Sequence, residues 1–458
     1  MSDKRRSSLP RLNTRPAGRN WAMTKLGVGT GVRVAGHNFF NLFRDAETRE
    51  TSNREFYARE AEKLADELGE LKGSVMKAGQ MLSLYGQYFM PPEAIAALSR
   101  LQDDTAHVDW QFVAPVVSQA LGEQRLAELT IDHEPLAAAS LGQVHRAWLK
   151  DDERELCVKI RYPGVDEAID SDVRTIARLL SFSRLVPRDL SLQPVFTEVR
   201  EMLHREVDYV HEAEMTATFR QRLAGDDRFV VPQILDRYSG SELLTMSFES
   251  GLSLNHPDVR GLSQARRNAL GQAFMELFLT EFFDWGLVQT DPHFGNYRVR
   301  PDEAGDRLVL LDFGATRKFP RQFVRDYAQI VAGALAGDQD QLLAGASGIG
   351  LMDHDFPAAV VRAFCELCAL IVEPFSQGGA RVPEGLFTAA GAYRWGESEL
   401  PARVTQQMGR AALTRHFRLP PREIVFLHRR MAGVFIVLAH LGVELDARPV
   451  LDAALARL

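Results

Sequence analysis

The sequence predicts an α+β protein in which helices come first, a small strand-rich unit follows, and a larger helical unit ends the chain. Three observations lead to this order. Apolar residues recur at helical spacing over residues 52–84, two β-prone runs flank a turn at residues 151–152, and almost every segment after Pro320 has a helical pattern. The 458 residues suffice for two or three domains, or for one large two-lobed unit with a sizeable core.

The first helical region carries a single apolar stripe. Apolar residues alternate at spacings of four and three over residues 52–84, which is typical of a helix with one buried face. The residues of this stripe are Leu64, Leu68, Leu71, Val75, Ala78 and Leu82. Pro91 and Pro92 end the region, and a second helical stretch is expected at residues 110–121, closed by Gly122.

The strand-rich unit begins near residue 136. Gln143–Leu149 and Glu155–Arg161 predict a hairpin around Asp151 and Asp152. We expect helices at residues 165–186, 194–224 and 262–285, and short strands at residues 229–236, 242–248, 296–300 and 307–311. Residues 424–441 predict a packed helix, because their longest apolar run has nine residues and a membrane span needs about 20.

Composition and charge narrow the class of protein. Apolar residues make up 45% and charged residues 25% of the chain, as in ordinary globular proteins. Three cysteines exclude a disulfide scaffold and fit a reducing compartment, and a net charge of −7 shows no global affinity for nucleic acid. Cys365 and Cys368 have metal-site spacing, but their helical pattern favours core thiols.

The charge is unevenly distributed along the chain. Residues 1–44 contain nine Lys or Arg and one acid, a net charge of +8, so the rest of the chain carries −15. Such a segment is a solvated tail, an anchor on an anionic membrane or an organelle transit peptide, and the tail is the leading interpretation. Any contact with a membrane is expected to be peripheral, since no apolar run is long enough to cross one.

Two acidic motifs in the second half of the chain indicate phosphoryl chemistry. Gln289–Asn296 places Asp291 five residues before Asn296, where a carboxylate orients a nucleophile and an amide oxygen binds Mg²⁺. Sixteen residues after Asn296, an apolar strand ends in Asp312-Phe-Gly, and this carboxylate is a candidate second ligand of the metal. The alternative is two ordinary Asp-containing turns, which the order and context of the motifs disfavour.

A lysine in an apolar strand is the third candidate. Lys159 lies within Leu156–Ile160, and a Lys in a buried strand is costly unless it is paired. It resembles the strand lysine of kinases that holds the α- and β-phosphates. The alternative is an exposed edge strand. Its acidic partner is expected within residues 205–214, where Asp208 and Glu212 would share one helix face, unless that face is merely solvated.

The segment before this strand lacks the glycines of a phosphate-covering loop. A protein kinase has Gly-x-Gly-x-x-Gly here, whereas this chain has an alanine-rich stretch, Ala137–His145. Because alanine does not adopt the positive φ angles open to glycine, we expect a stiffer loop that holds a nucleotide differently.

Together these motifs resemble the UbiB/ADCK family of atypical kinase-like proteins. The sequence Lys77-Ala78-Gly79-Gln80 matches that family's Lys-x-Gly-Gln signature, and the resemblance runs from about residue 60 to 320. It implies a protein kinase-like bilobal fold with an N-terminal helical extension and a mostly helical C-lobe. The implied parts are a basic tail at residues 1–50, the extension at 51–135, the N-lobe at 136–251 and the C-lobe at 252–458.

The resemblance also implies roles for individual residues. It places Lys77 and Gln80 on the extension near Glu206 and Asp208. Helix geometry puts Lys77 and Gln80 on the face opposite the apolar stripe. The alternative is that these two side chains are simply exposed to solvent. The implied catalytic residues are Asp291, Lys159, Glu212, Lys77 and Gln80. The implied nucleotide-binding residues are Ala137, Ala138, Ala139, Ser140, Gly142, Gln143, Val144, Lys159, Glu206 and Asp208. The implied Mg²⁺ ligands are Asn296 and Asp312.

Departures from protein kinases shape the expected activity. Gln289 and Thr290 replace the His-Arg pair, only a few residues separate Gly314 from Pro320, and no Ala-Pro-Glu follows, so the peptide-docking platform is missing. We therefore expect ATP hydrolysis, or phosphoryl transfer to a small acceptor, rather than protein phosphorylation. The resemblance implies a role in ubiquinone or another isoprenoid quinone synthesis at a membrane surface, with ATP and Mg²⁺ as cofactors.

Two other functions stay open. One is a small-molecule phosphotransferase of the aminoglycoside-kinase type, against which the Lys77–Gln80 segment argues. The other is a non-catalytic, nucleotide-gated scaffold for lipid. The expected partners are ATP or ADP, quinone-like or isoprenoid lipids, an anionic membrane and quinone-biosynthesis enzymes, without nucleic acid. The expected location is the cytoplasm, peripherally on the inner membrane, or the mitochondrial matrix in a eukaryote.

Overall fold

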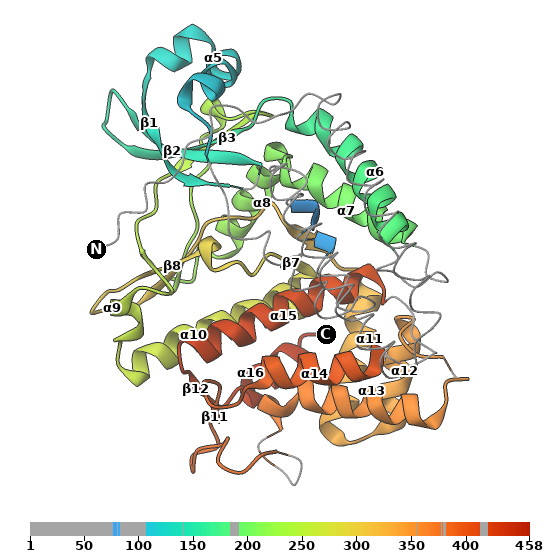
Figure 1. Cartoon of the computed structure of the whole chain (residues 1–458). Helices are drawn as coiled ribbons and strands as arrows, with labels where there is room; N and C mark the ends of the chain where they lie inside the picture. The colour runs from blue at the N-terminus through green and yellow to red at the C-terminus, as the bar shows by residue number, and fades with distance from the viewer. Residues whose placement is uncertain are drawn as a thin grey trace, which may run out of the picture. The chain divides into compact units, whose positions relative to one another are not determined.

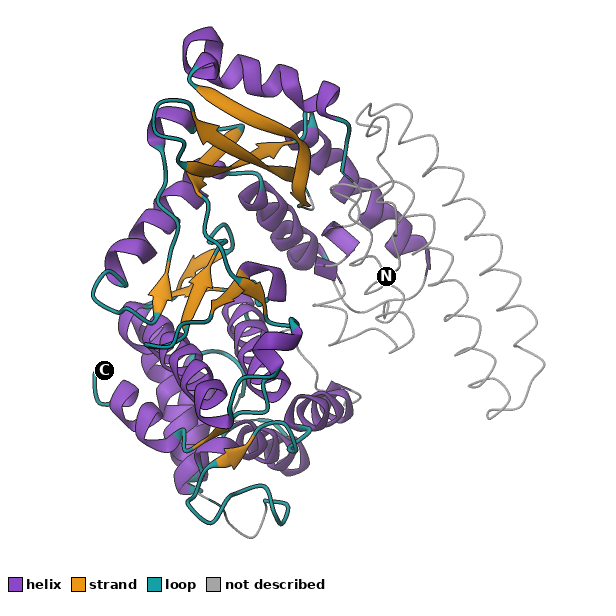
Figure 2. Cartoon of the chain, turned by 90° about the vertical axis from the view of Figure 1, so that its left-hand side faces the viewer, coloured by secondary structure: helices purple, strands orange, loops and turns teal. Residues whose placement is uncertain are grey.

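The computed structural model describes residues 77–79, 81–82, 107–139, 141–183, 192–353, 355–376, 378, 382–412 and 420–458. The expected basic tail, most of the helix expected over 52–84, Gln80 and Ser140 lie outside the described residues. The chain divides into two compact units. The first comprises Met1–Glu214 and Gln233–Phe248, and the second comprises Met215–Pro232 and Glu249–Leu458. Helices and strands occur in both units, which confirms the predicted α+β class (Figure 1, Figure 2). The predicted domain limits stay predictions.

The first unit is built on an antiparallel sheet with the strand order β1-β2-β3-β5. Its strands are β1 (Leu129–Ala138), β2 (Gly142–Leu149), β3 (Glu155–Arg161) and β5 (Leu243–Ser247). Its helices are α5 (Trp110–Ala127), α6 (Val165–Ser183), α7 (Gln193–Glu206) and the start of α8 (Tyr209–Arg222). The predicted hairpin is therefore confirmed as β2 and β3, and β3 lies inside the sheet (Figure 1).

Strand β3 shows why this segment folds as a buried strand. Leu156, Val158 and Ile160 are fully buried and alternate with Cys157 and Lys159, which face the opposite side of the sheet. Since β3 pairs with β2 and with β5, the alternative of an exposed edge strand for Lys159 is wrong.

Strand β1 was not predicted. Its sequence has no clean apolar alternation, because it is an edge strand with mostly half-buried and exposed side chains. Its pairing with β2 also shifts register on both sides of Pro135, a residue that cannot donate a ladder hydrogen bond.

The helix predicted at residues 194–224 is wrong as a single element. The chain breaks between α7 and α8, where the Asp208 side chain accepts a hydrogen bond from the His211 amide at 3.0 Å and so caps α8. Helix α5 likewise runs past its predicted end at Gly122. That glycine has a φ of 68° and kinks the helix instead of ending it.

The second unit is mainly helical. Its helices are α9 (Pro257–Arg260), α10 (Gln264–Leu279), α11 (Arg321–Ala336), α12 (Gln339–Gly348), α13 (Ala358–Ile371), α14 (Leu400–Ala412), α15 (Arg422–His440) and α16 (Arg448–Leu455). One sheet has the order β4-β9-β8-β6, from β4 (Phe229–Val230), β9 (Arg307–Leu310), β8 (Tyr297–Arg300) and β6 (Leu252–Ser253). Two further pairs are β7 (Leu287–Gln289) with β10 (Thr316–Lys318), and β11 (Tyr393–Arg394) with β12 (Glu444–Leu445).

Helices α10 and α15 form the core of this unit. Phe274 and Phe278 of α10 and Phe426 and Phe435 of α15 are buried, so residues 424–441 are a packed helix as predicted. The helix predicted at 262–285 is confirmed, but its last turn, Thr280–Trp285, is a π-helix. No helix within the described residues combines the length and apolar character that crossing a bilayer requires.

We predict that Gly142→Ala destabilises the first unit by about 1–3 kcal/mol. A Cβ at this position would overlap the Ile160 carbonyl oxygen of β3 and lie 2.6 Å from the Tyr209 hydroxyl. Chemical denaturation measures the change in the free energy of unfolding. Gly225→Ala is the matched control, since a Cβ there meets no atom within 4 Å. Equal stability of the two variants would contradict the prediction.

Candidate active site

In the first unit, Lys159 and Glu212 form a buried ion pair. The Lys159 ammonium lies 2.8 Å from each carboxylate oxygen of Glu212 on α8, and the two side chains are 12% and 3% exposed. The Lys159 ammonium also lies 5.2 Å from the centre of the Tyr209 ring. The structure thus brings together the lysine and one of the acids that the sequence proposed as its partner.

An apolar cluster belongs to the same part of the unit as this pair. Tyr209, Leu244 and Met246 are buried together, and Cys157 is packed against them. Since Lys159 lies on the same strand face as Cys157, its charge is held in a region of low polarity. The Glu212 carboxylate then offsets the buried charge and holds the ammonium in place.

The alanine-rich segment forms the end of β1 and the turn into β2. Ala137 and Ala138 pair with Val144 and Gln143, and the Ala139 amide donates to the Gly142 carbonyl at 2.9 Å. The residues on the two sides of this turn are therefore joined by hydrogen bonds, and the stiffness expected from alanine stays a prediction.

The Gln143 side chain forms hydrogen bonds within the protein. Its Oε1 accepts from the Val108 amide at 3.1 Å, and its Nε2 lies 2.8 Å from His145 Nε2. His145 Nδ1 donates to the Asp132 carbonyl at 2.7 Å, and burial lowers the pKa of this histidine, so the ring stays neutral. Any nucleotide contact of Gln143 must therefore come from its main chain, and sequence reasoning missed this network.

The signature lysine of the N-terminal extension pairs with the end of α7. Lys77 Nζ lies 2.9 Å from Glu206 Oε1, with side chains 10% and 30% exposed, so plain solvent exposure of Lys77 is wrong. Asp208 precedes the first residue of α8 and serves as its cap. The Glu212 amide donates to the Asp208 carbonyl at 3.1 Å, so the two residues lie one turn apart, and the expectation that their side chains share a helix face stays a prediction.

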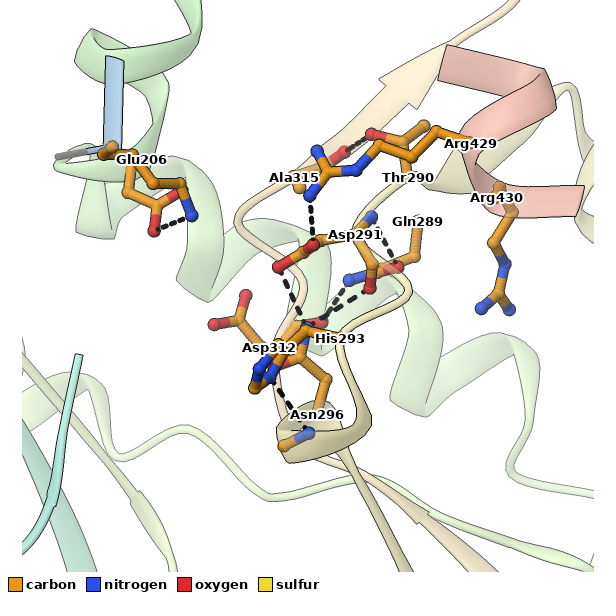
Figure 3. A network of polar contacts seen from close by, with 12 residues as sticks. Glu206, Gln289, Thr290, Asp291, His293, Asn296, Asp312, Ala315, Arg429 and Arg430 are labelled. Carbon is orange, nitrogen blue, oxygen red and sulfur yellow. Dashed lines mark hydrogen bonds and ion pairs between the residues drawn. The ribbon is translucent and has the colours of Figure 1, made fainter. Parts of the chain in front are cut away.

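In the second unit, the structure joins Asp291 to Asn296. The Asn296 amide nitrogen donates to both Asp291 Oδ2 and the Asp291 carbonyl, each at 3.2 Å (Figure 3). The Asp312 carboxylate accepts from the Gly314 amide at 3.0 Å and so forms the turn that follows β9. Phe313 is 1% exposed and packs against Phe219, with the centres of the two rings 4.6 Å apart.

The residues that replace the His-Arg pair hold the two motifs together. Gln289 Nε2 donates to the Asp312 carbonyl at 3.2 Å, while Gln289 Oε1 accepts from the Asp291 amide at 3.0 Å. Thr290 Oγ1 donates to the Ala315 carbonyl at 2.7 Å (Figure 3). Both side chains are buried, at 4% and 1% exposure. Neutral side chains therefore fix the geometry that these motifs need.

Behind the loop lies a buried polar network that the sequence analysis missed. Arg430, Glu281 and Tyr297 are 1%, 1% and 3% exposed. The Arg430 guanidinium donates to the Tyr297 hydroxyl at 2.5 Å and to Glu281 at 3.2 Å. Burial raises the pKa of Glu281 to about 7, although the Arg430 charge works in the opposite direction. For Arg430 and Glu281, the available signal was charge within otherwise apolar helical stretches.

The donor set fits Mg²⁺. Carboxylate and amide oxygens, as in Asp312 and Asn296, are the hard ligands that this ion takes, with nucleotide phosphates and water completing its shell. Among the described residues, no three His, Cys, Asp or Glu side chains gather as a metal cage, as is usual for a site of this kind. Burial raises the pKa of both Cys365 and Cys368, which agrees with core thiols.

Comparisons with known proteins identify the family of this chain. A family profile described as "ABC1 atypical kinase-like domain" matches residues 100–345. The class defined by the fold and the site is thus that of atypical kinase-like proteins. The chain belongs to the ABC1 atypical kinase-like family, of which UbiB/ADCK is another name.

Relatives of known name extend the match. The chain is 30% identical over 398 residues to "Atypical kinase COQ8, mitochondrial" of Schizosaccharomyces pombe, covering 87% of this chain and 63% of that protein. It is 32% identical over 390 residues to "Atypical kinase COQ8B, mitochondrial" of Rattus norvegicus, covering 85% of this chain and 70% of that protein. The chain thus spans about two thirds of these relatives.

A solved structure has a similar fold. The complex of Rv3197 with erythromycin from Mycobacterium tuberculosis superposes with a TM-score of 0.59 and 26% identity, covering 88% of this chain and 97% of that one. The predicted kinase-like fold class is confirmed.

We predict that Lys159→Met destabilises the protein by about 3 kcal/mol, because it removes the ammonium that pairs with the buried Glu212 carboxylate. The double variant Lys159→Met with Glu212→Leu recovers most of this loss, since no buried charge remains. Urea denaturation measures both changes. Neither variant is expected to gain thermal stability from added ATP. Stabilisation of the double variant by ATP at the wild-type level would contradict a phosphate-binding role of Lys159.

We predict that the stability contributed at Glu281 decreases as pH rises. Its pKa is raised from 4.5 to about 7 in the folded protein, so the folded state binds the proton more tightly. The contribution is therefore complete below the unfolded pKa and is lost as pH rises through about 7, by about 3 kcal/mol in total. Urea denaturation of wild type and Glu281→Gln across this range measures it. A difference that does not change with pH would contradict the prediction.

Proposed function

We propose that this protein binds Mg·ATP and hydrolyses it, or transfers its phosphoryl group to a small acceptor, in support of ubiquinone or another isoprenoid quinone synthesis at a membrane surface. The observation that carries this proposal is the buried pairing of Lys159 with Glu212 together with the linked Asp291, Asn296 and Asp312 motifs. Membership of the atypical kinase-like family supports it.

In this proposal each group of residues has one role. Lys159, held by Glu212, contacts the nucleotide phosphates, and the main chain of the turn at residues 137–144 covers them. Asn296 and Asp312 hold Mg²⁺, which when bound neutralises charge on the phosphates. Asp291 orients the acceptor. Lys77, with Gln80, Glu206 and Asp208, governs which acceptor reaches the site.

Water or a small molecule suits this site better than a protein acceptor. The His-Arg pair that answers activation-loop phosphorylation is replaced by Gln289 and Thr290, whose side chains are buried and bonded to the main chain of the Asp-Phe-Gly turn. Only Thr316–Lys318, a three-residue strand paired with β7, separates that turn from Phe319 and α11. A peptide-docking platform has no room in this connection.

A small-molecule phosphotransferase of the aminoglycoside-kinase type is the second candidate. The solved structure with a similar fold is described as a complex with erythromycin, a bulky organic molecule. The third candidate is a non-catalytic scaffold in which nucleotide gates lipid binding. In that case nucleotide would stabilise the protein, but Asp291→Asn would leave its cellular role intact.

The basic N-terminal segment supports a membrane partner. Its net charge of +8 would attract an anionic lipid surface, whereas the remaining chain, at −15, would not. Two relatives carry the word mitochondrial in their names. We propose peripheral association with the inner membrane from the cytoplasmic or matrix side, alongside quinone-biosynthesis enzymes and without nucleic acid.

We predict that Asp312→Asn lowers ATP hydrolysis at least about 100-fold, because a metal-binding carboxylate is lost. Phosphate release is measured with Mg²⁺, with and without liposomes of anionic lipid, which are expected to stimulate the wild type. Asp340→Asn, an exposed residue of α12, is the matched control and should match the wild type.

Wild-type activity no greater than that of Asp312→Asn would overturn the enzymatic part of the proposal. The biosynthetic part is tested separately by profiling quinone intermediates in a deletion strain complemented with wild type or Asp312→Asn. Unchanged quinone pools in the deletion strain would remove it.

A further inference from the structure

Two successive arginines of helix α15 act on the same catalytic loop, one directly and the other through a neighbouring residue. Arg429 donates through Nη2 to Asp291 Oδ1 at 2.5 Å, across 138 residues of sequence (Figure 3). The two side chains are 11% and 19% exposed, so little water screens the pair. Because adjacent helical residues point about 100° apart, the next arginine takes a different direction.

Arg430 acts on the main chain of the same residue. Its guanidinium donates to the Tyr297 hydroxyl at 2.5 Å, and that hydroxyl donates to the Asp291 carbonyl at 3.4 Å. Glu281 of the π-helix completes the network at 3.2 Å from Arg430.

The backbone of α15 approaches the loop closely as well. Gly433 packs on Pro292, the residue after Asp291, and a Cβ at Gly433 would lie 2.7 Å from Pro292 Cγ and overlap Pro292 Cβ. The helix therefore contacts the loop directly at one carboxylate and one proline ring, and it acts on one carbonyl through Tyr297.

The loop lacks a cation of its own. Residues 291–296 contain neither Lys nor Arg, and His293 Nδ1 accepts a hydrogen bond from the Gly295 amide at 3.0 Å. The positive charge that offsets Asp291 therefore comes from outside the loop, and the structure shows Arg429 in that position.

We propose that Arg429 is the positioning residue of the catalytic carboxylate, with Arg430, Tyr297 and Glu281 fixing the main chain beneath it. The two oxygens of Asp291 are held from different directions, Oδ1 by Arg429 and Oδ2 by Asn296. Rotation of the carboxylate is thereby restrained, and an acceptor meets it in one orientation. The partly neutralised charge suits a loose phosphoryl-transfer transition state, which needs orientation more than strong base.

The inference rests on the proposed function for its catalytic readout, and the test has two readouts. The first is the steady-state hydrolysis of Mg·ATP by wild type, Arg429→Met, Arg429→Lys, Asp291→Asn and the double variant Arg429→Met with Asp291→Asn. Arg422→Met is the matched control on the same helix, about two turns earlier, where the side chain is 57% exposed.

We expect Arg429→Met to lower kcat at least about 10-fold with KM for ATP changed less than about 2-fold, since the residue acts on the acceptor side. Arg429→Lys should recover part of kcat, and Arg422→Met should match the wild type. In the Asp291→Asn background, Arg429→Met should lower kcat by a further factor of less than about 2, because Arg429 acts through Asp291. Undiminished kcat in Arg429→Met, or additive losses, would overturn the inference.

The second readout separates this inference from the proposed function. Thermal unfolding of the wild type and the three variants of the double-mutant cycle measures whether Arg429 and Asp291 are coupled, and it needs no turnover. A non-additive cycle with an inactive wild type would retain the pairing and reject the proposed hydrolysis. Additive thermal shifts would reject the pairing itself.

Discussion

The need to pair buried charge governs both units of this protein. A charge removed from water is costly unless an opposite charge and hydrogen bonds meet it. Lys159 and Glu212 satisfy this condition in the first unit, and Arg430 and Glu281 do so in the second. Each pair joins elements far apart in sequence, so the same interaction that keeps a charge in place also fixes one strand or helix against another.

Neutral side chains and a distant helix replace the usual parts of a kinase catalytic loop. Gln289 and Thr290 join the loop to the Asp-Phe-Gly turn by hydrogen bonds that carry no net charge. The cation beside Asp291 arrives from α15 instead. This arrangement supports the proposal that the site acts on water or a small molecule rather than on a protein.

Local patterns predicted the elements whose periodicity is strong. The β2–β3 hairpin, helix α10 and the order of the acidic motifs all follow from short-range sequence. The edge strand β1 was missed because its side chains are largely exposed and its register shifts at Pro135. The break before α8 was missed because Asp208 reads as an ordinary helical acid, although its side chain caps the following turn.

The sequence by itself determined the α+β class, the identity of the acidic motifs and the strand lysine, because these depend on residue type and spacing along the chain. The family resemblance already pointed to Glu212 as the partner of Lys159, which the structure confirms. Tertiary structure alone decided that the Gln143 side chain forms internal hydrogen bonds and that Arg429 reaches Asp291. Those outcomes depend on contacts across tens to more than a hundred residues. Such contacts leave no periodic signal, since they are set by how the helices and strands pack.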